Sequence, residues 1–162
     1  MASFEITSNV FKIDSDANSV YALLSDFNKM GVLVNMTKQM DTSEMMPTLG
    51  KLADNIESVT FTSDSVHLII KGIGELSIQI VEREEPKLIK LVNTGKLPMN
   101  LTVWIQLLSN GPYDTRLRMT VHVQMNSMLK MLLKGKMEKI INTVAEGLTK
   151  IPYSILNNLT NV

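Results

Sequence analysis

The chain has 162 residues, no cysteine and no formal net charge at pH 7, with 16 Lys plus Arg balanced by 16 Asp plus Glu. Neutrality disfavours a general nucleic-acid binder, and the lack of cysteine excludes disulfides, thiolate metal sites and a cysteine nucleophile. Hydrophobic residues at 44% and charged residues at 20% are ordinary for a globular domain, and the length suits a single domain over 1–162.

The sequence gives no indication of membrane insertion. Its start lacks the basic and apolar segments of a secretory signal, and no apolar run reaches the roughly 20 residues of a membrane-spanning helix. We therefore expect a soluble cytoplasmic protein without integral membrane association. Composition does not specify its oligomeric state.

The N-terminal region predicts a strand followed by a helix. Residues 2–13 mix apolar and polar positions as a strand does, and the alternation slips at Val10 and Phe11, where we expect a bulge or bend. Ser15 is placed to cap a helix that begins at Asp16, whose charge favours the first turn.

A second short helix and a segment of unclear structure come next. Asp26 can cap a short helix that runs through Val34. The segment from Asn35 to Asp54 contains four methionines, and Pro47 and Gly50 interrupt any continuous helix there. It is interpreted either as a mobile cover over one end of a cavity or as a permanent cap on the core.

Residues 56 to 125 predict strands that are joined mostly by short turns, and therefore an antiparallel sheet. With the first strand this makes about seven strands, and the glycines of Gly72-Ile73-Gly74 predict a bend between two of them. One face of the last two strands is predicted to be apolar: Leu97, Met99, Leu101, Val103, Ile105 and Leu107, then Leu117, Met119, Val121, Val123 and Met125.

Residues 126–151 predict the only long helix, with Asn126 as its N-cap. Its apolar residues recur at steps of three and four and so share one face: Leu129, Leu133, Met137, Ile140, Val144, Leu148 and Ile151. A long apolar face needs an apolar surface to cover it, and a sheet supplies one.

The order of elements and two local stretches resemble the START-like or SRPBCC superfamily, also called helix-grip, in its polyketide cyclase-like branch. The first stretch runs from Val10 to Ile13 and on through Ser15 to Phe27; the second is the hairpin from Ile80 to Ile89. The resemblance implies an α+β helix-grip fold, in which a curved antiparallel sheet grips the last helix with an apolar cavity between them. The segment from Asn35 to Asp54 matches no motif of the superfamily.

The resemblance and the apolar faces predict that an apolar or amphipathic small molecule, lipid-like or polyketide-like, binds in that cavity without a cofactor. The residues expected to contact it are Phe61, Leu68, Ile78, Met99, Val103, Leu117, Met119, Val121, Leu133, Met137, Ile140 and Val144. Three alternatives remain open: a cyclase- or lyase-like enzyme, a module that binds a protein partner, and a core that these residues fill completely.

Few residues suggest catalysis or metal binding. His67 and His122 lie on different strands without clustered carboxylates, so they are interpreted as surface residues and no metal site is expected. Glu82, Glu84 and Glu85 flank a turn beside basic residues, which is typical of a solvated hairpin.

Two further features have a structural and a functional interpretation. Lys130, Lys134, Lys136 and Lys139 form a basic patch that could contact anionic lipid or a partner. The alternative is a solvated face on which Lys134 pairs with Glu138 at i,i+4. Trp104 falls on the polar side of its strand, where cross-strand packing on the outer face is expected, with a subunit contact as the alternative.

Overall fold

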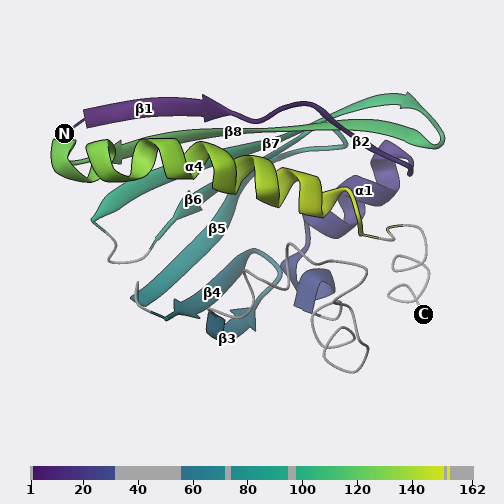
Figure 1. Cartoon of the computed structure of the whole chain (residues 1–162). Helices are drawn as coiled ribbons and strands as arrows, with labels where there is room; N and C mark the ends of the chain where they lie inside the picture. Colours follow the sequence, from purple (N-terminus) through teal and green to yellow (C-terminus); the bar gives the residue numbers. More distant parts are fainter. Residues whose placement is uncertain (1, 32–55, 72–73, 95–97, 152, 154–162) are drawn as a thin grey trace.

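The computed structural model describes residues 2–31, 56–71, 74–94, 98–151 and 153 (Figure 1). The strands are β1 (Ala2–Thr7), β2 (Phe11–Ile13), β3 (Ile56–Phe61), β4 (Ser65–Ile70), β5 (Gly74–Glu84), β6 (Leu88–Asn93), β7 (Met99–Gly111) and β8 (Asp114–Met125). Helix α1 (Ala17–Leu24) follows β2, and helix α4 (Ser127–Leu148) follows β8. The segment from Asn35 to Asp54, the first two residues of the predicted glycine bend and Leu97 lie outside the described residues.

The strands form one antiparallel sheet in the order β1-β8-β7-β6-β5-β4-β3, and β2 also pairs with β8. The sheet curves, and α4 lies along it next to β1 (Figure 1). This confirms the predicted α+β class, with a curved antiparallel sheet and a long C-terminal helix. None of the described helices is long and apolar enough to cross a membrane.

The predicted break in the first strand is confirmed, slightly earlier than expected. Residues 8–10 separate β1 from β2. Ser8 bridges the break, because its backbone N–H donates to the Met119 carbonyl (2.8 Å) and its hydroxyl accepts the Met119 N–H (2.9 Å). The Asn9 N–H is then free of the strand ladder and donates to Oδ1 of Asn142 on α4 (2.8 Å).

The cap of α1 is one residue later than predicted. Asp16, not Ser15, is the N-cap: its carboxylate accepts the Ser19 N–H (3.0 Å) and the Ser19 hydroxyl (2.6 Å). The side-chain hydrogen bond from Ser19 holds the pKa of Asp16 below its usual value. Ser15 is instead buried, and its carbonyl accepts the Thr115 hydroxyl (2.7 Å).

The second short helix is confirmed in its described part. Residues 27–31 are helical, and the Asp26 carboxylate accepts the Asn28 N–H (3.0 Å), as expected of a cap. Gly31 lies against the Phe61 side chain, because a Cβ built on Gly31 would be 3.0 Å from Cδ2 of that ring. The predicted continuation to Val34 is outside the described residues.

The predicted N-cap of α4 is confirmed, whereas the assignment of Ile140 to its buried apolar face is wrong. Oδ1 of Asn126 accepts the Leu129 N–H (2.8 Å). The fully buried apolar residues of α4 are Ile141, Ala145 and Leu148, at 9% exposure or less, while Ile140 is 50% exposed. Ile140 therefore does not lie in the sheet–helix interface as expected, because its neighbour Ile141 occupies that position.

We predict that Ile141→Asp lowers the free energy of unfolding by about 4 kcal/mol or more, because it places an unpaired carboxylate in the core. Ile140→Asp is the matched control. It should cost less than about 1 kcal/mol, since the new charge stays in contact with water. Urea unfolding followed by circular dichroism measures both, and equal losses would contradict the observed helix face.

Tyr153 closes the C-terminal end of the core. Its side chain is fully buried, and its hydroxyl donates to the Leu148 carbonyl (2.5 Å) at the end of α4. Burial raises the pKa of Tyr153 above the ordinary value of 10.0. The folded protein thus keeps a proton that the unfolded chain loses at alkaline pH.

Because the folded pKa of Tyr153 is raised, its contribution to stability is present below pH 10 and is lost as the pH rises further. We expect Tyr153→Phe to lose about 1 kcal/mol at neutral pH, through the missing hydrogen bond, and to show a shallower alkaline decline than wild type. Tyr113→Phe, at a tyrosine that is 76% exposed, is the control and should follow the wild-type curve. Identical alkaline slopes for all three proteins would contradict this role.

Candidate ligand-binding site

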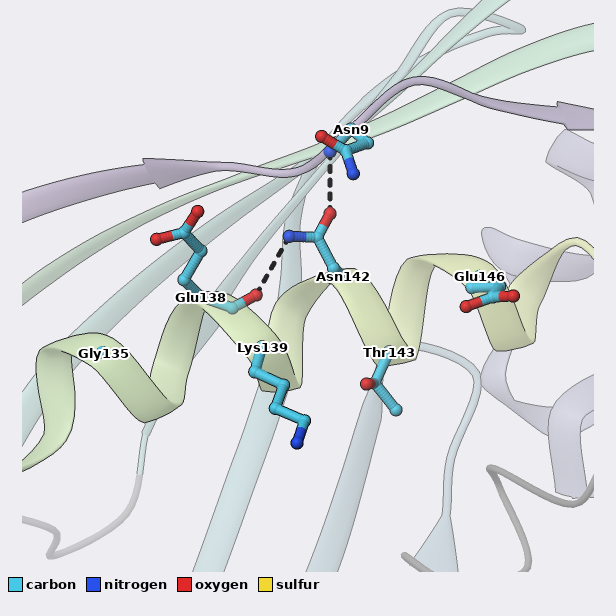
Figure 2. Close-up of a pocket in the computed structure, with 7 residues that line it drawn as sticks. All are labelled: Asn9, Gly135, Glu138, Lys139, Asn142, Thr143 and Glu146. Carbon is cyan, nitrogen blue, oxygen red and sulfur yellow. Dashed lines mark hydrogen bonds between the residues drawn. The ribbon is translucent and has the colours of Figure 1, made fainter.

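The helix α4 covers one side of the sheet and leaves the rest of the concave face to other elements. It packs chiefly on β1 and β8, while α1 packs on β7 and β8. Asn142 fixes the orientation of α4, since its amide accepts from Asn9 beside β1 and donates to the Glu138 carbonyl (3.1 Å). The Asn142 side of α4 therefore faces the β1 side of the molecule (Figure 2).

The opposite flank of α4 faces away from β1. Successive residues of an α-helix are about 100° apart, so Ile140 lies about 200° from Asn142. The members of this flank are Leu133, Met137, Ile140 and Val144. Leu133, Met137 and Val144 are partly buried and pack against the core, and Ile140 is half exposed.

On the concave face of the sheet, apolar side chains of neighbouring strands lie beside one another. Phe61 is opposite Val66, and Val66 is opposite Ile78, so the three lie side by side on one face. Leu68 lies two residues after Val66 and therefore shares that face. Phe61, Leu68 and Ile78 are partly buried, and so retain apolar surface that neighbouring side chains do not cover.

The other strand residues predicted to bind a ligand divide into two groups. Met99 and Val103 on β7 are partly buried and pack against the core. Leu117, Met119 and Val121 are buried at 7% exposure or less on β8, the strand that pairs with β1 and against which α4 packs. The alternation predicted for β8 is thus confirmed, and the ligand contacts of these residues stay predictions.

Of two surface hollows lined by described residues, one shares no residue with the predicted site and the other shares Leu117. The larger, about 350 Å³, runs along the outer side of α4 (Figure 2), and its lining residues are Asn9, Gly135, Glu138, Lys139, Asn142, Thr143 and Glu146. Figure 2 shows that Lys139 and Thr143 point away from Asn9, so the polar groups do not converge on one point. The other, about 230 Å³, is lined by Val10, Gln106, Leu107, Leu108, Arg116, Leu117 and Arg118.

Sequence comparison matches this chain to no protein-family model and to no curated protein. Solved structures do match it in fold. Truncated norcoclaurine synthase from Thalictrum flavum is 8% identical, with a TM-score of 0.62 and 92% of each chain covered. The Zhui aromatase/cyclase from a Streptomyces species is 10% identical, with a TM-score of 0.62 over 91% of this chain and 92% of the other. A START superfamily protein from Mycobacterium smegmatis is 13% identical, with a TM-score of 0.56 over 96% of this chain and 98% of the other.

The chain has a START-like, helix-grip fold. The shared architecture spans nearly the whole of each chain, which confirms the fold expected from the resemblance. At these identities the similarity establishes the fold and not the activity.

The histidines of this START-like fold lie on the outer face of the sheet, as expected. His67 is exposed, and its Nδ1 is 2.6 Å from the Ser77 hydroxyl on the neighbouring strand. His122 is opposite Thr102 and Glu5. Within the described part of the chain, no three His, Asp or Glu residues are grouped as a metal ion would require.

The remaining features singled out by sequence also lie at the surface. Glu82, Glu84 and Glu85 are exposed around the β5–β6 turn, in agreement with a solvated hairpin. Trp104 packs across strands on the outer face, where Nζ of Lys90 lies 5.7 Å from the ring centroid.

The predicted pairing of Lys134 with Glu138 is not among the ion pairs of the described residues. The Lys134 ammonium instead lies 6.0 Å from the centroid of the Phe4 ring on β1. A cation over an aromatic face is attracted by the negative π surface, so this contact replaces the helical pair.

Arg83 is a structural residue of the site that sequence reasoning missed. Its Nε and Nη2 donate to the Ser25 carbonyl (3.1 and 3.0 Å), and Nη2 also donates to Oδ1 of Asp64 (2.6 Å). Ser25 follows α1, and Asp64 lies in the β3–β4 turn. Arg83 thus joins the outermost hairpin of the sheet to the end of α1. Its partners are 58 and 19 residues away, so no local pattern indicates them.

We expect Arg83→Gln to weaken this junction. The ion pair is partly exposed, so the loss in unfolding free energy should be only about 1 kcal/mol, and smaller at high salt. The local effect should be larger: amide exchange should quicken at Phe27 and Ile80, whose N–H groups donate to Ser63 and Asp64 carbonyls in the same turn.

Arg118→Gln provides the control for this prediction. Arg118 is exposed and donates to Gln106 on the adjacent strand (2.7 Å), far from the β3–β4 turn. Its replacement should leave amide exchange at Phe27 and Ile80 unchanged. If both variants behave alike, Arg83 does not join the hairpin to α1.

Proposed function

We propose that the protein binds an apolar or amphipathic small molecule between the concave face of the sheet and the flank of α4 that contains Ile140. The observation that carries the proposal is the half exposure of Ile140 on this flank, together with the partial exposure of Phe61, Leu68 and Ile78 on the strands beyond β7. Apolar side chains on both elements thus retain surface that a ligand can cover.

The energetic basis is the removal of this surface from water. Each methylene group of a ligand that leaves water contributes about 0.8 kcal/mol. A chain of about ten such groups would reach micromolar affinity once the costs of association are subtracted. The partly exposed residues Met99 and Val103 on β7 extend the apolar surface toward α4.

Structural neighbours support a small molecule as the ligand class. One structure of norcoclaurine synthase from Thalictrum flavum holds dopamine and hydroxybenzaldehyde, which both combine an aromatic ring with polar groups. Another neighbour is an aromatase/cyclase. The proposal takes from them the class of ligand and not the reaction.

The buried ionisable side chains favour binding over catalysis. Among the described residues these are two tyrosines, Tyr21 and Tyr153. Burial raises the pKa of Tyr21, as does the nearby charge of Glu85, while Arg83 opposes the shift. Burial also raises the pKa of Tyr153, so both phenols hold their protons at neutral pH, and neither supplies a base.

The first experiment is native mass spectrometry of the protein purified from its own host. A retained small molecule of apolar or amphipathic character is the expected result. Titration of the purified protein with anilinonaphthalene sulfonate, a fluorescent amphipathic probe, then gives a dissociation constant that can be compared between variants.

We predict that Ile140→Ser weakens binding of this probe about tenfold, because it removes apolar contact from the flank. Val81→Ser is the matched control: Val81 is also 50% exposed, but it lies in the irregular part of β5 between Ile80 and Glu82, away from the buried face. Wild-type binding by both variants would contradict the proposed location. Absence of any bound molecule or probe would contradict the proposed function.

A further inference from the structure

The first turns of α4 expose three large apolar side chains, which we call the exposed ridge. Met128 is 74% exposed, Met131 is 87% exposed and Leu132 is 64% exposed. Around the helix, Leu132 lies about 180°, Met128 about 140° and Met131 about 80° from the buried Ile141, so the ridge extends from the β1 side of α4 to the side that faces away from the sheet. A surface helix of a globular protein normally presents polar residues on this side.

The surface next to the ridge is open. Gly135 lies close to the line of Met128 and Leu132, one turn further along α4. A Cβ built on Gly135 would have no neighbouring atom within 4 Å. No described element therefore contacts α4 at this position of its surface.

Two lysines of α4 lie beside the ridge. Lys136 lies about 40° and Lys139 about 20° from Leu132 around the helix, and both are exposed. The ammonium groups of Lys130 and Lys134 lie 5.9 and 6.0 Å from the Phe4 ring centroid, on the β1 side. Lys130 and Lys134 each lie about 200° from Leu132 around the helix, so they do not belong to the ridge side of α4.

We propose that the N-terminal half of α4 docks the protein on an anionic membrane surface. The three side chains of the ridge would enter the boundary between lipid headgroups and acyl chains. Lys136 and Lys139 would reach along the surface to lipid phosphates and carboxylates. An exposed apolar strip flanked by lysines is the pattern of helices that lie in a membrane interface.

The charge distribution favours a lipid surface over a second copy of the chain. Pairing of two ridges across a two-fold axis would bring together two helices that each carry four lysines, Lys130, Lys134, Lys136 and Lys139, against two carboxylates, Glu138 and Glu146. An anionic bilayer offers apolar depth and negative charge together. The docking surface is on the opposite side of α4 from the sheet, so it does not depend on the proposed ligand.

The test is co-sedimentation of the full chain with vesicles. One set contains phosphatidylcholine and phosphatidylserine in equal amounts, and the other contains phosphatidylcholine alone. We expect binding to the anionic vesicles that weakens as salt is raised, and much weaker binding to the neutral ones. Leu132→Ser should lower the partition coefficient about fivefold, and Lys136→Gln by a similar factor.

The chain offers a matched control for each variant. Leu108→Ser removes a leucine with the same 64% exposure from β7, and Lys87→Gln removes an exposed lysine from the β5–β6 turn. Both should bind anionic vesicles like wild type. Circular dichroism checks that all four variants are folded, which their exposure favours.

Three outcomes would overturn the proposal. The first is failure of the wild type to sediment with anionic vesicles. The second is equal loss of binding in Leu132→Ser and Leu108→Ser. The third is a dimer in size-exclusion chromatography that Leu132→Ser abolishes, which would assign the ridge to a second copy of the chain.

Discussion

The packing of α4 on β1 and β8 is the contact on which the rest of the structure depends. Helices in proteins derive most of their stability from the packing of an apolar face, and in α4 this face includes Ile141, Ala145 and Leu148 in the core. Fully burying one large aliphatic side chain contributes about 1.5–3 kcal/mol. Once this stripe is buried, the other sides of α4 have defined surroundings: one flank faces away from β1 over the sheet, and the opposite side faces out.

The curvature of the sheet determines which residues lie on the concave side together with that flank of α4. The register of β5 and β6 shifts between Ile80 and Glu82, and such irregularities bend a sheet. Arg83 then joins the β3–β4 turn to Ser25, which follows a helix packed on β7 and β8. The edge of the sheet is thereby held near elements that lie on its other half, and apolar residues of β3, β4 and β5 remain partly exposed on the concave side.

The two proposals concern different sides of one helix. The flank with Ile140 would contribute to a ligand site, whereas the exposed ridge would contact lipid. Both follow from the same property, which is that the first half of α4 carries apolar side chains on several sides while only one stripe is packed. The partly exposed residues of the flank and the fully exposed ridge have no covering element among the described residues.

The sequence by itself determined the local features: the alternation of β8, the Asn126 and Asp26 caps, and the element order that predicts the helix-grip fold. These depend on side chains within a few residues of one another. The tertiary structure alone decided which stripe of α4 is buried, because Ile140 and Ile141 both belong to apolar series with steps of three and four. It also decided the partners of Arg83, the replacement of the Lys134–Glu138 pair by Phe4, and the division of predicted ligand contacts into buried and partly exposed groups. Those outcomes depend on contacts between segments far apart in the chain, which no local periodicity specifies.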